Sequence, residues 1–180
     1  MCIRDSLWCG TFQFLHTTNT VAGSGGNEMS KPIAVFPGSF DPVTIGHWSI
    51  LQRALPLFSK VYVALGVNTS KQGMFPHDQR ELWLRESFAG MPGVEVVRFE
   101  GLTAELCKRL GATFILRGLR NSTDHGNERS IALMNRALGG VETIFLPALP
   151  EHAHISSTIV RELIANKTDV AAFLPPGMKL

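Results

Sequence analysis

Residues 36–48 read Phe-Pro-Gly-Ser-Phe-Asp-Pro-Val-Thr-Ile-Gly-His-Trp. This stretch follows the short apolar run Ile33–Phe36 and precedes a helical pattern, so a buried strand is predicted to end in a Pro/Gly turn that leads into a helix. His47 would lie near the N-terminus of that helix, where backbone N–H groups and the helix dipole favour anions. Such a turn suits a protein that holds a nucleoside triphosphate for attack. The alternative is a plain strand–helix turn in which His47 caps the helix.

From Lys31 onward, short apolar runs alternate with helical patterns. This order predicts an α/β fold, a doubly wound parallel five-stranded sheet with helices on both faces. In such sheets ligands bind beyond the carboxyl ends of the strands. The predicted strands are Ile33–Phe36, Val61–Leu65, Val94–Phe99, Phe114–Leu116 and Thr143–Leu146, and the predicted helices are Trp48–Phe58, Asp78–Phe88, Thr103–Leu110 and Ser130–Leu138. Asp78, Thr103 and Ser156 are predicted N-caps, and Gly90, Gly111 and Gly139 are predicted stops.

The chain has 180 residues, of which 44% are hydrophobic and 18% charged, and these values fit one globular domain over residues 29–180. A net charge of +2 is too small to indicate binding of nucleic acid or of a membrane surface. Three cysteines offer neither a disulfide framework nor zinc spacing, so we expect a cytoplasmic protein. Within residues 1–28, the stretches 17–20 and 23–27 are polar and loop-like, and the whole segment is expected to be a non-native or disordered leader. A targeting peptide is the alternative.

Three further clusters follow predicted strands or open a predicted helix. Lys71 could follow a phosphate through a reaction, although most loop lysines are merely solvated. Arg117 and Arg120 flank a glycine at a strand end and suit phosphate recognition, with salt bridges to nearby acids as the alternative. The hydroxyl run Ser156–Thr158 at a helix start can hold a triphosphate, whereas ordinary capping explains only one of its hydroxyls.

Taken together, these motifs resemble the phosphopantetheine adenylyltransferase family of the (T/H)xGH nucleotidyltransferase superfamily, over about residues 31–175. The resemblance implies a Rossmann-like nucleotidyltransferase fold. It rests on PGSFDPVTIGH at 37–47, Ser70-Lys71, Met74-Phe75, RGLR at 117–120, Met134-Asn135-Arg136, ISST at 155–158 and Phe173-Leu174-Pro175.

The resemblance implies transfer of the adenylyl group of ATP to 4′-phosphopantetheine, giving dephospho-coenzyme A and pyrophosphate, by in-line attack without a covalent enzyme intermediate. His47, Lys71 and Ser39 would be catalytic. Ser39, Lys71, Thr103 and Arg117 would bind phosphopantetheine. The residues implied for ATP are Ser39, Phe40, His47, Gly118, Leu119, Arg120, Glu128, His152, Ala153, His154, Ile155, Ser156, Ser157 and Thr158. Mg²⁺ would be bound mainly through substrate phosphates with no protein metal site, and a homohexamer is the implied assembly.

The chain departs from the family pattern where members usually read Asp-Phe-Glu-Tyr-Glu, because it has Asp124-His125-Gly126-Asn127-Glu128. His152 stands where members often carry tryptophan, and the chain ends soon after Pro176. Two alternative functions remain: a sister nucleotidyltransferase that uses another phosphorylated acceptor, and a catalytically weak nucleotide-binding relative. The intact His47, Lys71 and Arg117 argue against the second.

Overall fold

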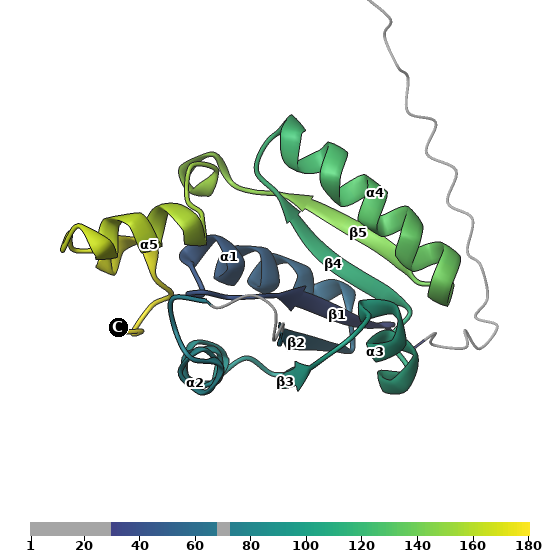
Figure 1. Ribbon diagram of the computed structural model, residues 1–180. Helices are drawn as coiled ribbons and strands as arrows, with labels where there is room; N and C mark the ends of the chain where they lie inside the picture. The colour runs from purple at the N-terminus through teal and green to yellow at the C-terminus, as the bar shows by residue number, and fades with distance from the viewer. Residues whose placement is uncertain (1–29, 68–72) are drawn as a thin grey trace, which may run out of the picture.

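The computed structural model describes residues 30–67 and 73–180, which include a five-stranded sheet. All strand pairs are parallel, and the order across the sheet is β3-β2-β1-β4-β5 (Figure 1). The strands are β1 (Ile33–Gly38), β2 (Lys60–Gly66), β3 (Val94–Phe99), β4 (Phe114–Leu119) and β5 (Glu142–Pro147). The predicted sheet is therefore confirmed. Because the chain order reverses between β1 and β4, the switch point of the fold lies at the carboxyl ends of these two strands.

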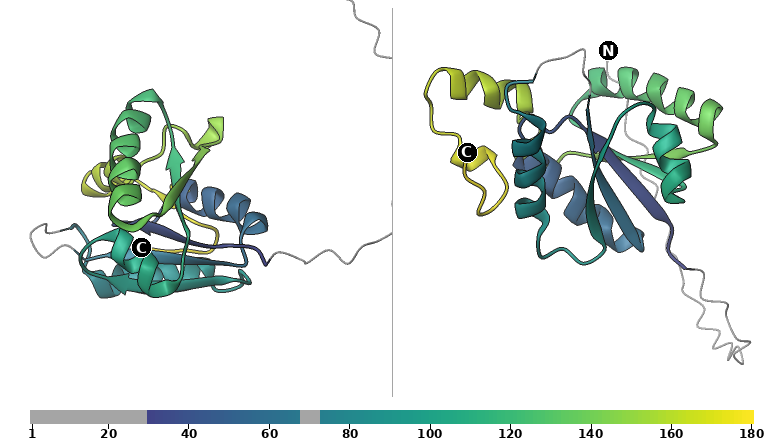
Figure 2. Two further views of the ribbon diagram at one scale, coloured as in Figure 1. Left: turned by 90° about the vertical axis from the view of Figure 1, so that its right-hand side faces the viewer. Right: turned by 60° about the horizontal axis from the view of Figure 1, so that its bottom comes forward.

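Helices cover both faces of the sheet, as predicted (Figure 2). The helices are α1 (Ile45–Ala54), α2 (His77–Phe88), α3 (Thr103–Leu110), α4 (Ser122–Gly139) and α5 (Ser157–Ala165). One buried cluster joins α1, α2 and α5 to the sheet, and a second joins α3 to the opposite face. Along β1, Phe36 faces the first cluster and Val35 the second, as the alternation of strand side chains requires.

Helix α4 begins at Ser122, eight residues before the predicted start at Ser130. Asn121 provides the start signal, because its side-chain oxygen accepts a hydrogen bond from the Asp124 backbone N–H at 2.9 Å. The region 124–128 is therefore helical. No residue of α4 is buried, so the apolar periodicity that reveals most helices is weak in its first half.

Two predicted N-caps are wrong, because Pro76 caps α2 and Leu102 caps α3. Asp78 lies in the first turn of α2 and forms an ion pair with Arg98 at 2.7 Å instead of capping the helix. Ser156 caps α5 as predicted, since its Oγ accepts from the Ile159 N–H.

The predicted helix stops are nearly right. Gly111 ends α3 as predicted, and it does so in the left-handed conformation, with φ 65°. Helix α4 ends with Gly139, and Gly140 is its left-handed cap. Ala89, one residue before the predicted Gly90, caps α2.

The first predicted helix also differs in its bounds, because α1 runs from Ile45 to Ala54 and a 3₁₀ turn follows at Leu55–Leu57. Pro56 within that turn lacks the N–H that a continuing α-helix would need. None of the helices in residues 30–67 and 73–180 has the length and apolar character needed to cross a membrane. The predicted leader at 1–28 and Lys71 lie outside the described residues.

Candidate active site

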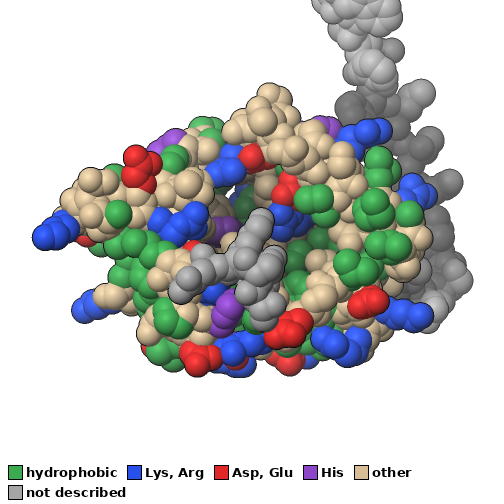
Figure 3. All heavy atoms as spheres, in the orientation of Figure 1, with side chains coloured by type: hydrophobic (Ala, Val, Ile, Leu, Met, Phe, Trp, Pro, Cys, Tyr) green, Lys and Arg blue, Asp and Glu red, His purple; other side chains and the backbone are tan. Residues whose placement is uncertain are grey.

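A cavity of about 280 Å³ opens at the carboxyl ends of β1 and β4, beside the N-terminus of α5. In the space-filling view, basic, acidic and histidine side chains gather around a hollow on this face (Figure 3). Twenty residues line the first cavity: Phe36, Pro37, Gly38, Ser39, Phe40, Thr44, Gly46, His47, Ile50, Arg117, Gly118, Arg120, Asp124, Glu128, Ala148, His152, Ile155, Ser156, Ser157 and Thr158.

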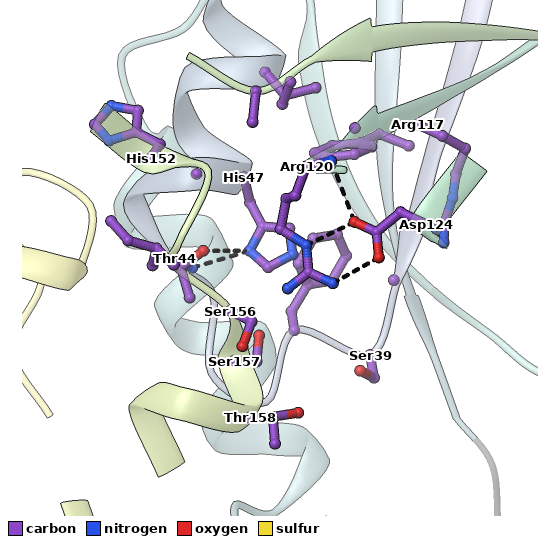
Figure 4. A pocket seen from close by; sticks show the side chains of 18 of the residues that line it. Ser39, Thr44, His47, Arg117, Arg120, Asp124, His152, Ser156, Ser157 and Thr158 are labelled. Carbon is purple, nitrogen blue, oxygen red and sulfur yellow. Dashed lines mark hydrogen bonds and ion pairs between the residues drawn. The ribbon is translucent and has the colours of Figure 1, made fainter. Parts of the chain in front are cut away.

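His47 lies in the first turn of α1, and its orientation is set by Thr44 (Figure 4). Its Nδ1 accepts a hydrogen bond from the Thr44 backbone N–H at 3.1 Å and lies 2.9 Å from the Thr44 hydroxyl. Because Nδ1 is an acceptor, a neutral imidazole must carry its proton on Nε2. The alternative interpretation of His47 as a helix cap is therefore correct for Nδ1, while Nε2–H has no hydrogen-bond partner among residues 30–67 and 73–180.

Burial of the imidazole, with the nearby Arg117 and Arg120 charges, lowers the pKa of His47 to about 4. At neutral pH His47 is therefore an uncharged donor rather than a cation. The ring of Phe40 packs edge-to-face against it at 5.1 Å between centroids, which contributes to the burial. A neutral Nε2–H donor in a sheltered cavity suits an oxygen that gains negative charge during a reaction.

Both arginines at the end of β4 are paired with carboxylates of α4. Arg117 makes a two-point ion pair with Glu128 and also donates to the Pro37 carbonyl. Arg120 makes two hydrogen bonds to Asp124, at 2.8 and 3.0 Å (Figure 4). These hydrogen bonds lower the pKa of Asp124. Both arginines therefore form the salt bridges that the alternative interpretation predicted. An anion that enters the cavity must compete with the two carboxylates for these arginines.

The hydroxyl run at the start of α5 is largely occupied by internal contacts. Ser156 caps the helix, and Ser157 Oγ donates to the Pro42 carbonyl at 2.8 Å. Thr158 Oγ1 accepts from Arg161 at 3.2 Å. Ser157 therefore ties α5 to the β1–α1 turn, while the first backbone N–H groups of the helix provide the anion-binding potential.

A second cavity, of about 540 Å³, adjoins the first on the α3–α4 side of the sheet. The two share Pro37–Ser39, Arg117 and Glu128, so the Arg117–Glu128 pair lies at their junction. The second cavity is otherwise lined by Gly66, Phe99, Thr103, Ile115, Ile131, Ala132, Asn135 and Thr143. Its largely apolar lining suits an elongated, uncharged arm rather than a second anion.

The structure brings together most of the residues singled out from the sequence. Thr103 lines the second cavity, and Ser39 and Arg117 line both. Leu119, Ala153 and His154 line neither cavity. Arg117 and Gly118 belong to β4, which extends three residues beyond its predicted end at Leu116, so they are strand residues rather than loop residues.

Sequence reasoning missed four residues that shape the site. Thr44 orients His47, and Asp124 pairs with Arg120. Asp41 accepts hydrogen bonds from the N–H groups of Met74 and Phe75, and Arg80 donates to the Ser39 carbonyl. Asp41 and Thr44 lie within the stretch 36–48 quoted above, and their place in that stretch is the sequence signal that could have indicated their roles. Nothing in the sequence distinguishes Arg80 from a surface arginine of an amphipathic helix.

No group of three or more His, Cys, Asp or Glu side chains that could hold a metal ion occurs among residues 30–67 and 73–180. Asp124 and Glu128 are the carboxylates in the first cavity, and each is engaged by an arginine. His152 also lines this cavity, and its Nδ1 is buried with no partner in the described part of the chain.

Comparison with known proteins identifies relatives along most of the chain. The family model described as cytidylyltransferase-like matches residues 35–163. The phosphopantetheine adenylyltransferase of Flavobacterium psychrophilum is 47% identical over 147 residues, covering 82% of this chain and 97% of that protein. The protein of the same name from Bacteroides thetaiotaomicron is 41% identical over 147 residues, with the same two coverages, 82% and 97%.

Among solved structures, a bifunctional NMN adenylyltransferase/ADP ribose pyrophosphatase from Francisella tularensis superposes with a TM-score of 0.65 at 16% identity. The match covers 82% of this chain and 46% of that longer one, so this chain spans about half of it. At this identity the likeness supports the fold alone.

Proposed function

The chain belongs to the phosphopantetheine adenylyltransferase family of cytidylyltransferase-like proteins, and on that premise we propose that it transfers the adenylyl group of ATP to 4′-phosphopantetheine. The products are dephospho-coenzyme A and pyrophosphate. The observation that carries this proposal is the pair of adjoining cavities that meet at Arg117 and Ser39. ATP occupies the first cavity, and the uncharged arm of phosphopantetheine occupies the second, which brings the two phosphates together at the junction.

Attack occurs at the α-phosphorus of ATP. A phosphate oxygen of phosphopantetheine forms a new P–O bond there while the bond to the bridging oxygen of the β-phosphate breaks, and pyrophosphate leaves with the electron pair. Both substrates react through phosphates, so no protein nucleophile is needed. The contribution of the protein is positioning and stabilisation of charge.

His47 donates its Nε2 proton in a hydrogen bond to an oxygen of the α-phosphate as charge develops there. The Thr44–Nδ1 contacts support this role because they fix the tautomer that carries the proton on Nε2. Arg120 exchanges Asp124 for the triphosphate, and Arg117 contacts the acceptor phosphate at the junction. Lys71 is proposed to contact the phosphates of both substrates, by family resemblance.

Mg²⁺ bound to the triphosphate would neutralise part of its charge, with substrate phosphates and water as its main ligands. The donor set supports this form of binding, because Mg²⁺ commonly keeps several waters and substrate phosphates as ligands, and the carboxylates of the first cavity are paired with arginines. The hydroxyl-bearing residues that line this cavity are Ser39, Thr44, Ser156, Ser157 and Thr158. A cytoplasmic location is proposed from the cysteine usage.

A homo-oligomer, a hexamer by family resemblance, is the proposed assembly. The exposed face of α4 supports it, because Ile131, Leu133, Met134 and Leu138 are each 50–59% exposed in the single chain. A cluster of large apolar side chains on one helix is typical of a surface that contacts another protein. Light scattering at micromolar concentration distinguishes a hexamer from a monomer.

The substrate test compares acceptors that differ in one feature. The protein is incubated with ATP, Mg²⁺ and one acceptor (phosphopantetheine, unphosphorylated pantetheine or nicotinamide mononucleotide), and pyrophosphate is measured. We expect turnover with phosphopantetheine alone. Equal rates with pantetheine would contradict the role of the acceptor phosphate, and preferential turnover of the mononucleotide would assign the chain to a sister activity.

A further inference from the structure

The turn between β1 and α1 is held by side chains from two other helices. Arg80 of α2 donates to the Ser39 carbonyl at 2.9 Å, and Arg161 of α5 donates to the Asp41 carbonyl at 2.6 Å. These two carbonyls flank Phe40, whose φ of 43° lies in the left-handed region. That conformation is strained for a non-glycine residue, so the surrounding contacts must maintain it.

Arg80 is the more unusual of the two arginines because it is 4% exposed. Its nearest carboxylate in the described chain is Asp41, with 3.9 Å between Nε and Oδ1. Both Asp41 oxygens are already engaged by backbone N–H groups, those of Met74 and Phe75. Arg80 Nε has no hydrogen-bond partner in the described residues. A buried guanidinium with an unsatisfied N–H is costly, and the hydrogen bond to the Ser39 carbonyl is the one that the Arg80 side chain makes within the part of the chain that the structure describes.

The turn held by Arg80 carries the groups that face the substrates. Ser39 lines both cavities, and the Phe40 ring packs against His47 at 5.1 Å and against Phe36 at 5.7 Å. If the Ser39 carbonyl were released, Phe40 could relax towards an ordinary φ and its ring would leave His47. Arg80 is therefore connected to His47 through Ser39 and Phe40.

We propose that Arg80 is a positioning residue, which holds the β1–α1 turn in its left-handed conformation so that Ser39 and His47 are aligned on the reacting phosphates. Arg80 lines neither cavity and touches neither substrate site. This proposal rests on the proposed adenylyl transfer. It predicts that loss of the Arg80–Ser39 contact affects kcat more than the KM for ATP, because the turn matters for alignment, whereas Arg120, which holds the triphosphate, lies directly after β4.

The test uses Arg80→Lys, which keeps the charge beside Asp41 but lacks the guanidinium fork. We expect kcat to fall roughly 10- to 100-fold, as for a misplacement of about 1 Å, with the KM for ATP within about threefold. A second variant, Arg80→Gln with Asp41→Asn, removes both charges together so that neither is left buried and unpaired. In this double variant too, kcat should fall while the KM for ATP changes little.

Two controls lie on the same helix. Leu84→Ala removes a fully buried side chain of α2 and should lower the melting temperature while kcat stays near normal. Arg85→Met removes an exposed arginine that pairs with Glu81 and should change neither quantity. If kcat in Arg80→Lys falls no further than in Leu84→Ala, the role is structural and the proposal is wrong.

A second readout does not depend on turnover. The ring-proton resonances of His47, assigned by comparison with His47→Gln, report on the adjacent Phe40 ring. They should move in Arg80→Lys and stay in place in Arg85→Met. Unmoved His47 signals would overturn the proposal even if kcat fell. If the unaltered protein releases no pyrophosphate with any acceptor, the proposed function fails, while this spectrum still decides whether Arg80 positions the turn.

Discussion

The two walls of the first cavity are built in opposite ways. On one side, residues 40–44 of the β1–α1 turn are buried, and Arg80, Arg161 and Ser157 hold three carbonyls of the turn. On the other side, α4 has no buried residue, and its ion pairs at the first cavity join Glu128 to Arg117 and Asp124 to Arg120. Arg80 and Arg161, which fix the first wall together with Ser157, line neither cavity, whereas the second wall consists of contacts that a substrate anion can replace.

This difference suggests that the wall formed by the β1–α1 turn serves catalysis and that the wall formed by α4 serves substrate binding. A catalytic donor must be held within a fraction of an ångström of its working position, and burial with many contacts achieves that. A binding residue must release its partner when the ligand arrives, so a partly exposed ion pair of low net energy suits it. Changes to the turn should therefore alter kcat, and changes to α4 should alter KM or stability.

The largest effect is expected at His47. His47→Ala removes the Nε2–H donor, and kcat should fall on the order of 100-fold or more, while the circular dichroism spectrum stays unchanged. His125→Ala removes a histidine of α4 and is the matched control, with kcat near normal. Near-normal turnover of a folded His47→Ala protein would reduce His47 to a helix cap and remove the distinction between the walls.

The second prediction concerns the pH dependence of stability. Burial lowers the pKa of His47 to about 4, from about 6.5 in the unfolded chain, so the unfolded state binds more protons between these values. The contribution of His47 is therefore complete above about pH 6.5 and declines as pH falls towards 4. Since the ring is partly exposed, we expect a loss of about 1–2 kcal/mol between pH 7 and pH 5.

Chemical denaturation of the protein and of His47→Gln at several pH values measures this contribution, because the difference between the two curves cancels the titration of shared carboxylates. The unaltered protein should lose more stability than the variant over the interval. Parallel curves would show that the imidazole is not shielded in the free enzyme.

The third prediction concerns Gly126, which lies inside α4, where an added Cβ would meet no neighbouring group of the described chain within 4 Å. Gly126→Ala should stabilise the protein by about 1 kcal/mol, because glycine in a helix interior costs about that much. Thermal melts measure this change, and kcat should not move. A destabilised variant would contradict the helical assignment of this segment.

The block change His125→Phe, Gly126→Glu and Asn127→Tyr should also lower the KM for ATP, by restoring the side chains usual in the family. Gly126→Ala is its control for helix stability alone. An unchanged KM in the block variant would mean that this part of α4 does not contact ATP, and the proposed role of Glu128 would be withdrawn with it.

The smallest effect is expected from Asp124→Asn, which frees Arg120 from a competing carboxylate. The KM for ATP should fall about two- to threefold, in line with the small net energy of a partly exposed ion pair. The pair Arg136–Glu142 lies at the opposite end of α4 and lines neither cavity, so Glu142→Gln is the control and should leave KM unchanged. A raised KM would mean that Asp124 orients Arg120 for ATP instead of competing for it.

The sequence predicts those parts of the molecule whose signals are local. The buried runs of β1 and β2, the left-handed Gly111 and the Ser156 cap all follow from neighbouring residues. The early start of α4 could not be predicted, since Gly126 and the polar residues around it hide the helix. Arg80 contacts Ser39, which lies 41 positions away in the sequence, and Arg117 contacts Glu128, which lies 11 positions away. Contacts over such separations leave no local sequence pattern, so only the folded chain reveals them.

The account is tested most directly by a crystal structure with a non-hydrolysable ATP analogue. We predict His47 Nε2 within hydrogen-bond distance of an α-phosphate oxygen, with Thr44 still donating to Nδ1 and the β1–α1 turn unmoved. Arg120 should have left Asp124 for the phosphates. An analogue whose α-phosphate lies away from His47, with the Arg120–Asp124 pair intact and the turn displaced, would contradict the division between a fixed catalytic wall and an exchangeable binding wall.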